Sequence, residues 1–282
     1  MKVGFVGAGK VGCSLAMHFV NSGVNVIGFY SRSTESAADA AAFTKSNYFS
    51  NLEELIKESD LIFITVPDDA IGDIWDRIRF MPIEGKYISH CSGSLSSKIF
   101  SGIEESGAFG FSVHPLLAVS DRHNSYKELP TAIFTIEGDD NHLGELKTFL
   151  SDCHLRVTAI SKEAKVRYHG AAVMASNLVV ALIDSAATEL RKCGIDDDLI
   201  NDALTPLVLN NVKNVLANGS IKALTGPIER GDINTVQKHL QVLDGLDKDI
   251  YSTLSLKALE IARQKNPKNL NYDQLEELLR TS

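Results

Sequence analysis

The first 160 residues alternate between short apolar runs and longer stretches with helical spacing. Runs of this length are typical of buried β-strands, and the stretches between most of them place apolar residues on one helix face. This alternation predicts an α/β domain with a doubly wound parallel sheet. The expected strands lie at 3–6, 24–29, 61–66, 87–89, 109–113, 132–136 and 155–160, and the expected helices at 11–22, 37–43, 52–57 and 71–79.

The strand pattern stops after about residue 160. Residues 162–192 keep helical spacing throughout, so they predict one continuous helix with Gly194 as its stop. Further helices are expected at 198–217, 236–246, 248–264 and 272–280. We therefore expect two domains, an α/β domain over residues 1–160 and an all-helical domain over residues 161–282.

A glycine-rich turn joins the first expected strand to the first expected helix. It reads Gly7-Ala8-Gly9-Lys10-Val11-Gly12. Gly7 permits a tight turn, Gly9 lets the backbone approach a pyrophosphate, and Gly12 lets the helix pack on the strand. The helix start also offers free N–H groups to an anion. A turn without a ligand is the alternative, but the context predicts a Rossmann-type dinucleotide site that uses all six residues.

The end of the second expected strand indicates which dinucleotide binds. NAD enzymes of this type carry an acidic residue there to accept from the ribose 2′-hydroxyl, but this chain has no acid until Glu35. It has Ser31, Arg32 and Ser33 instead, a forked cation between two hydroxyl donors, which suits a 2′-phosphate. We predict NADP(H) as the cofactor; the alternative is a solvated loop arginine.

Two more polar loops follow expected strands, at residues 66–69 and 91–94. Ligands of open α/β sheets bind at the carboxyl ends of the strands, so both loops are candidates for cofactor contact. Asp68 or Asp69 could equally cap a helix that starts at Ile71. The residues assigned here to the cofactor are Val66, Pro67, Asp69 and Ser92.

Composition excludes several classes of protein. A net charge of −8 and a pI near 5.5 argue against a nucleic-acid or anionic-membrane partner. The four cysteines are scattered, so neither a metal site nor a disulfide framework is expected. The chain begins directly with a strand pattern, which favours a cytoplasmic location over secretion. The longest apolar stretch, 171–187, contains Asp184, so we expect a buried or subunit-contact helix there and no membrane span.

These features resemble the oxidoreductases that join a Rossmann domain to a helical domain of the 6-phosphogluconate dehydrogenase type. Their characterised members include pyrroline-5-carboxylate reductase, ketopantoate reductase, prephenate dehydrogenase and the β-hydroxyacid dehydrogenases. Residues 31–33 are similar to the NADP-reading loop of several of them. The chain resembles more closely a subgroup of these oxidoreductases whose substrate is unassigned. The residues that carry this resemblance are 90–93, 114–116, 165–177, 224–232 and 239–240.

The resemblance directs attention to Lys165 and His169. Four-residue spacing puts them on one helix face, with Ser176 near the same face. β-Hydroxyacid dehydrogenases and ketopantoate reductase carry a functional lysine with an asparagine four residues later, where this chain has His169. Lysine or histidine can polarise a substrate and donate the proton that accompanies hydride transfer. A surface lysine and a structural histidine are the alternatives.

Three further polar residues are candidates for substrate contact or for a structural role. His114 precedes Pro115 at the end of a strand. A similar His-Pro step lies beside the substrate in prephenate dehydrogenases, so the resemblance implies that His114 is near a substrate. A buried structural histidine is the alternative. Arg230 could reach an anionic substrate, and Asp232 is more simply explained as a helix N-cap.

These expectations define a function and its competitors. We expect an NADP(H)-dependent oxidoreductase that moves hydride to or from a small C=O or C=N substrate, of the hydroxy acid, keto acid or imine type. Lys165, His169 and His114 are the candidate catalytic residues. The alternatives are a non-catalytic NADP(H) sensor or scaffold and a prephenate-dehydrogenase-like enzyme. The alanine-rich helix over 162–192 is expected to form a homodimer.

Overall fold

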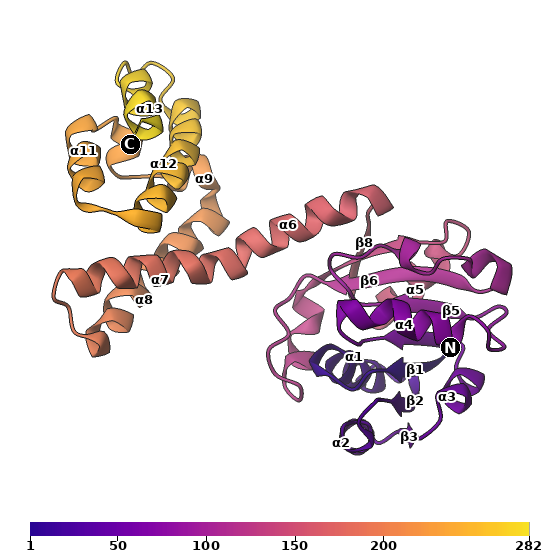
Figure 1. Cartoon of the computed structure of the whole chain (residues 1–282). Coiled ribbons are helices and arrows are strands. Elements are labelled where there is room, and N and C mark those ends of the chain that lie inside the picture. Colours follow the sequence, from indigo (N-terminus) through magenta and orange to yellow (C-terminus); the bar gives the residue numbers. More distant parts are fainter. Residues whose placement is uncertain (282) are drawn as a thin grey trace. The chain divides into compact units, whose positions relative to one another are not determined.

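The computed structural model describes residues 1–281 and divides into two compact units, Met1–Ser176 and Asn177–Ser282. The first unit is a sheet with helices on both faces, and the second is all helical (Figure 1). The expected Rossmann-type α/β domain followed by helices is therefore confirmed. The division comes after Ser176 and not near residue 160, because the first helix after the sheet packs on the sheet itself.

The first unit contains one eight-stranded sheet in the order β3-β2-β1-β4-β5-β6-β7-β8. Strands β1 to β6 are parallel, as predicted, and β7 adds one antiparallel pairing with β6. The segment after β6 contains only short 3-10 turns, so no long helix carries the chain back before β7. The strands are β1 (Lys2–Val6), β2 (Asn25–Tyr30), β3 (Asn47–Phe49), β4 (Leu61–Ile64), β5 (Tyr87–His90), β6 (Phe109–Pro115), β7 (Ile133–Gly138) and β8 (Arg156–Ala159).

Helices cover the two faces of this sheet and bury two apolar clusters. One cluster lies under α1, α2 and α5, and the other lies under α3 and α4. The helices of this unit are α1 (Lys10–Asn21), α2 (Thr34–Thr44), α3 (Leu52–Glu58), α4 (Asp68–Ile78), α5 (Leu143–Asp152) and α6 (Lys165–Ala175). Its 3-10 turns are η1 (Ser97–Ile99), η2 (Ile103–Ser106), η3 (Ser125–Lys127), η4 (Leu129–Thr131) and η5 (Lys162–Ala164).

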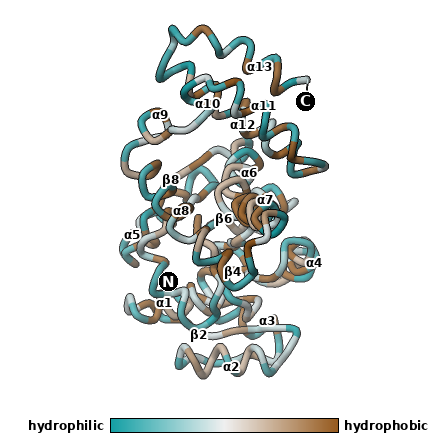
Figure 2. The backbone as a smooth tube through the Cα atoms, turned by 90° about the vertical axis from the view of Figure 1, so that its left-hand side faces the viewer, coloured by the Kyte–Doolittle hydropathy of each residue, from teal (hydrophilic) through white to brown (hydrophobic). Residues whose placement is uncertain are grey.

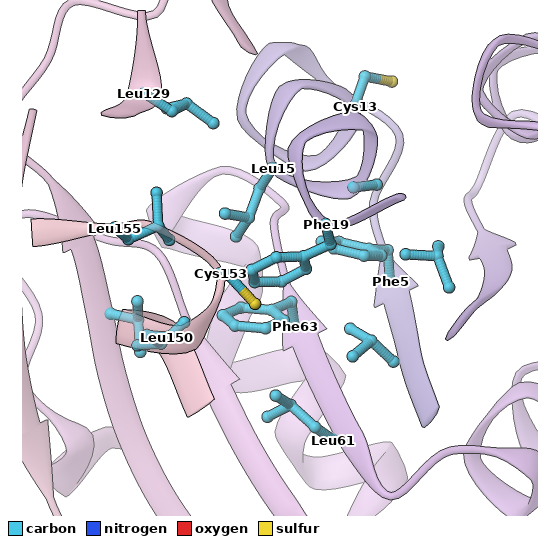
Figure 3. Close-up of a cluster of buried hydrophobic side chains, with 14 of the residues drawn as sticks. Phe5, Cys13, Leu15, Phe19, Leu61, Phe63, Leu129, Leu150, Cys153 and Leu155 are labelled. Carbon is cyan, nitrogen blue, oxygen red and sulfur yellow. The ribbon is translucent and has the colours of Figure 1, made fainter. Parts of the chain in front are cut away.

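Aromatic rings fill the centre of the first cluster (Figure 3). Phe5 of β1 lies between Phe29 of β2 and Phe63 of β4, with ring centroids 5.3 and 5.5 Å apart, and Phe19 of α1 reaches Phe63 at 5.6 Å. These contacts fix the first helix on the central strands, so they also fix the turn between β1 and α1.

The second unit contains the helices α7 (Asn177–Lys192), α8 (Asp197–Asn218), α9 (Ser220–Ala223), α10 (Pro227–Arg230), α11 (Ile233–Val242), α12 (Gly245–Lys265) and α13 (Tyr272–Arg280). Its main core lies among α10 to α13, and a small second core joins α7 to α8. The expectation of one continuous helix over 162–192 is corrected, because Ser176 leaves helical geometry at φ −129° and ψ −81° and separates α6 from α7.

Length and composition alone would allow residues 162–192 to span a membrane, and only a small part of this stretch is buried in the chain. Helices of soluble proteins pass the same test, so this stretch gives only weak support for a membrane span. The exposed part of the stretch includes apolar side chains of α7 such as Leu178 and Val180. Figure 2 shows the apolar character of α7 as brown tube.

The aromatic cluster generates a stability prediction. Phe5→Ala removes a fully buried ring from the centre of the sheet and should lower the free energy of unfolding by about 3–5 kcal/mol. Phe80→Ala is the matched control, because Phe80 is 84% exposed, and its change should stay within about 0.5 kcal/mol. Urea unfolding followed by circular dichroism measures both. Equal losses in the two variants would contradict the assignment of the core.

Candidate active site

The glycine-rich turn has the geometry that its spacing predicts. Gly7 has a φ of +112°, and a Cβ atom there would lie 2.7 Å from the backbone of Thr65 at the end of β4. A Cβ atom on Gly12 would lie 2.5 Å from the Thr65 hydroxyl, which donates to the Gly7 carbonyl at 2.9 Å. These contacts bring the turn and the start of α1 against β4, where larger residues would not fit.

Gly9 and Lys10 differ from Gly7 and Gly12 because they face open space. A Cβ atom on Gly9 would have only the Thr65 carbonyl near it, at 4.0 Å, and both residues are exposed. No side chain caps α1 at Gly9, and the first turn of this helix holds no acidic residue. The turn therefore offers space and N–H donors that fit the pyrophosphate of a dinucleotide.

In the loop after β2, Ser33 has a structural role and Arg32 is exposed to solvent. The Ser33 hydroxyl caps α2 by accepting from the Ser36 N–H at 3.2 Å, which leaves Ser31 and Arg32 as the stronger candidates for a 2′-phosphate. Arg32 is exposed. Nearby, Arg77 of α4 donates to the Tyr30 hydroxyl at 3.1 Å, a contact that sequence reasoning missed.

The loops after β4 and β5 are joined by hydrogen bonds to one carboxylate. Asp68 accepts from the Ser92 hydroxyl at 2.6 Å and from the Ser94 hydroxyl at 2.8 Å. The helix after β4 begins at Asp68 and not at Ile71, so Asp68 and Asp69 both lie in its first turn and Pro67 is its N-cap. Asp68 and Asp69 are both exposed, and the hydrogen bonds show that the Asp68 carboxylate joins the two loops.

Beyond β5 the sheet carries a row of buried polar side chains. His90 of β5 is paired in register with Ser112 of β6, which is paired in register with Glu137 of β7. Neighbouring residues Ile88 and Phe111 belong to opposite apolar clusters, so alternation along the strands puts the three polar side chains on the face that carries α3 and α4. Each of the three is at most 1% exposed.

Helix α6 covers this polar row with Lys165. The Lys165 ammonium donates to the Ser112 hydroxyl at 2.6 Å, and the residue is only 1% exposed. Burial disfavours its charged form and lowers the pKa of Lys165 to about 8, while Glu137 is the strongest group that opposes this shift. Lys165 is therefore a buried cation and not the surface lysine of the alternative interpretation.

Glu137 is held by a turn on the same face of the sheet. Its two carboxylate oxygens accept from the backbone N–H and the hydroxyl of Ser97, both at 2.7 Å. Ser97 begins η1, which follows the loop after β5. Two hydrogen bonds from Ser97 therefore hold the carboxylate in place without any ligand.

His114 lies one step further along β6, on the same face as Ser112. Its Nδ1 atom is 2.8 Å from the hydroxyl of Tyr168 on α6. Burial, followed by repulsion from Lys165, lowers the pKa of His114 to about 4, so this imidazole is neutral at physiological pH. Burial also lowers the pKa of His90 to about 4.

His169 completes the cluster from the next turn of α6. A Cβ atom on Gly93 would lie 2.6 Å from Nδ1 of His169 and 2.8 Å from Nε2 of His114, so any side chain at this position would overlap both rings. The two ring centroids are 6.4 Å apart. The Nδ1 atom of His169 is buried and has no hydrogen-bond partner within the described part of the chain.

The three predicted catalytic residues, Lys165, His169 and His114, therefore come together in the first unit, beside the loop that follows β5. Other residues of the cluster were missed from the sequence. They are Ser97, Ser112, Glu137 and Tyr168. A signal for some of them existed, because Ser112 and Glu137 interrupt or end apolar strands.

The segment 224–232 belongs to the second unit and has a structural explanation there. Asp232 is the N-cap of α11 and accepts from the Thr235 N–H at 3.1 Å, as expected. The carbonyls of Arg230 and Gly231 accept from Asn269 and Asn271. The Arg230 side chain is exposed, and a substrate contact for it stays a prediction.

Comparison with protein families divides the chain in a similar way. Residues 1–115 match a Rossmann-like domain, and residues 132–258 match the family described as a domain of unknown function, DUF2520. A search of curated proteins finds no match to this sequence.

Solved structures share the fold over nearly the whole chain. A protein of Bacteroides fragilis, proposed to be an NADP oxidoreductase, has 22% identity and a TM-score of 0.70, covering 95% of this chain and 98% of its own. A reductive aminase of Aspergillus terreus, in complex with NADPH and ethyl-5-oxohexanoate, has 15% identity and a TM-score of 0.63, with 99% and 92% covered. Pyrroline carboxylate reductase of Plasmodium falciparum, with NADP bound, has 19% identity and a TM-score of 0.61, with 98% of each chain covered. At these identities the likeness concerns the fold alone, and it agrees with a match to a Rossmann-like domain followed along the chain by a match to DUF2520.

Proposed function

We propose that this protein is an NADP(H)-dependent oxidoreductase that transfers hydride to or from a small molecule with a C=O or C=N bond. One observation carries the proposal: a buried lysine and two histidines converge beside the loop after β5, in the same unit as a glycine turn that fits a dinucleotide. NADP(H), when bound, would supply or accept the hydride. The reductive aminase and the pyrroline carboxylate reductase that share this fold support the proposal by analogy.

The binding residues of the proposal lie at the carboxyl ends of β1, β2, β4 and β5, where open α/β sheets bind their ligands. The turn from Gly7 to Gly12 would hold the pyrophosphate, and Ser31 and Arg32 would hold the 2′-phosphate. The loops that contain Val66, Pro67, Asp69 and Ser92 would line the rest of the cofactor site.

Proton transfer is assigned to the lysine and histidine cluster. When hydride reaches a carbonyl or imine carbon, the oxygen or nitrogen gains an electron pair and needs a proton or a nearby positive charge. Lys165 can supply positive charge, and His169 has an unpartnered ring nitrogen beside Gly93. A non-catalytic sensor would have no need for a buried lysine beside two half-buried histidines, because burying polar groups costs free energy.

The first test of the proposal concerns cofactor choice. NADPH should bind more tightly than NADH in a fluorescence titration, because Arg32 can pair with the 2′-phosphate. Arg32→Ala should weaken NADPH binding by about 10- to 100-fold, the usual value of a charge-assisted contact, and leave NADH binding unchanged. Arg156→Ala, an exposed arginine on the far edge strand β8, is the matched control. Equal affinity for the two cofactors in the parent protein would exclude the assignment.

The second test concerns chemistry. A panel of cyclic imines, keto acids and hydroxy acids is screened for a change in NADPH absorbance. With any active substrate, Lys165→Ala and His169→Ala should each lower kcat by about 10² to 10⁴-fold, as loss of a general acid or charge does, while NADPH affinity changes little. Arg167→Ala on the exposed side of α6 is the control. Variants that keep full kcat after their folding is verified would remove these residues from the mechanism.

We also propose that the protein forms a homodimer through the helices of its second unit. Apolar side chains on α7 and α8 are exposed in the single chain, among them Val180 at 69% and Leu216 at 81%. Exposed apolar surface of this extent is typical of protein–protein interfaces.

Sedimentation velocity at micromolar concentration tests the dimer. The parent protein should sediment with about twice the mass of one 30.7 kDa chain, and Val180→Asp with Leu216→Asp should shift it towards the monomer, because burying two carboxylates in an apolar interface is unfavourable. Leu270→Asp is the control, since Leu270 is 93% exposed on the short loop between α12 and α13. A monomer of the parent protein would contradict the proposal.

A further inference from the structure

We propose that Glu137 is a positioning residue for Lys165: its buried carboxylate, held by Ser97, keeps the Lys165 ammonium protonated and directed at Ser112. The proposal rests on the function proposed above only in that the Lys165 ammonium is given a catalytic role there. The arrangement itself is built entirely from residues of the first unit.

The strand register puts the three groups side by side. Ser112 stands between His90 and Glu137 on neighbouring strands, and directly opposite residues of an antiparallel pair, such as Ser112 and Glu137, have Cβ atoms about 4.5–5.5 Å apart. The ammonium of Lys165 is bonded to the middle member of this row. The carboxylate of Glu137 is therefore within electrostatic reach of the ammonium, without a direct ion pair between them.

The carboxylate is fixed in a way that suits this role. Both of its oxygens accept hydrogen bonds from Ser97, and the residue is 1% exposed. A carboxylate buried only to hold η1 would carry a desolvation cost that a neutral glutamine would avoid, because its Oε1 could accept from the Ser97 N–H while its Nε2 donates to the Ser97 hydroxyl. The nearby Lys165 ammonium explains why a negative charge is present at Glu137, whereas the hydrogen bonds to Ser97 do not require one.

Lys165 has few other groups that could balance its charge. The groups that face it or act on it electrostatically are Glu137 on β7, Asp68 at the start of α4, Cys91 after β5, His90 on β5, His114 on β6 and Tyr168 on α6. Asp68 acts on Lys165 in the same direction as Glu137, but its effect is the smaller of the two. Both histidines have lowered pKa values and are neutral near pH 7, so they neither add to the positive charge of Lys165 nor balance it.

The sign of the effect follows from these charges. Burial lowers the pKa of Lys165 to about 8, and the negative charge of Glu137 opposes that fall. Removing the negative charge should lower the pKa of Lys165 further. At pH 7 the lysine would then lose much of its positive charge, and with it the ability to donate a proton or to stabilise a developing negative charge.

The test measures the ionisation of Lys165 directly, with neither cofactor nor substrate. Protein is prepared with ¹³C-labelled lysine, and the Lys165 Cε signal, assigned by its absence in Lys165→Met, is followed from pH 5 to pH 11. In Glu137→Gln the midpoint should fall by about 1 unit or more, the usual effect of losing a nearby opposite charge. Glutamine can accept from the Ser97 N–H and donate from its Nε2 to the Ser97 hydroxyl, so the variant removes the charge with little change in shape.

Glu145→Gln is the matched control. Glu145 lies on α5, where it accepts from the Tyr87 hydroxyl at 2.5 Å, and α5 packs on the opposite face of the sheet. The Lys165 midpoint should be unchanged in this variant. An unchanged midpoint in Glu137→Gln as well would overturn the proposal, because a purely structural Glu137 would not affect the ionisation of Lys165.

A second variant keeps the proposal falsifiable if Glu137→Gln does not fold. In Glu137→Met, which removes the same negative charge at a similar side-chain length, the midpoint of the Lys165 Cε signal should also fall relative to the parent protein. No change would overturn the proposal. Failure to bind NADPH or to turn over any substrate would contradict the proposed function and leave this result intact. With an active substrate, the fall of kcat at alkaline pH should begin at lower pH in Glu137→Gln.

Discussion

The hydrogen bond between the Lys165 ammonium and the Ser112 hydroxyl is the contact on which the candidate site depends. A lysine that is 1% exposed needs a partner, because an ammonium without one would be too costly to bury. This bond therefore fixes the first turn of α6 on the sheet. The same helix carries Tyr168 and His169, so one contact sets the position of every site residue that α6 contributes.

The two halves of the sheet face have different compositions, and the difference explains where the site is. Under α3 and α4 the face is apolar, with residues such as Ile62, Ile64 and Ile88. Next to it, on β5 to β7, the same face carries hydroxyl, imidazole and carboxyl groups. Helices α3 and α4 are fixed by apolar packing, whereas α6 adds a lysine that matches the polar row.

Local features of the sequence were sufficient for the parts of the site that lie close together along the chain. The glycine turn could be read from three glycines at fixed spacing after a strand, and Lys165 and His169 from a four-residue interval on a helix. The break at Ser176 gave no such signal, since helical spacing continues across it. The start of α4 was placed too late because Asp68 and Asp69 serve as well inside a first turn as before it.

The remainder of the site depends on strand register, which no short segment encodes. His90, Ser112 and Glu137 are far apart in sequence and become neighbours only when β6 pairs with β5 on one side and with an antiparallel β7 on the other. The direction of β7 could not be inferred from its apolar pattern, which is the same for either direction. The partnership of Glu137 with Ser97 and its place beside Lys165 were therefore out of reach of sequence reasoning.

The polar row also sets a limit on engineering. Replacing buried ionic groups by well-packed aliphatic side chains is often neutral or stabilising, by about 1–4 kcal/mol. A selection for thermal stability alone would thus favour aliphatic residues at Ser112, Glu137 and Lys165, and would produce a more robust protein that has lost its buried charges. Stabilisation of this fold is better sought on surfaces remote from α6, where gains in melting temperature need not be exchanged for the chemistry of the site.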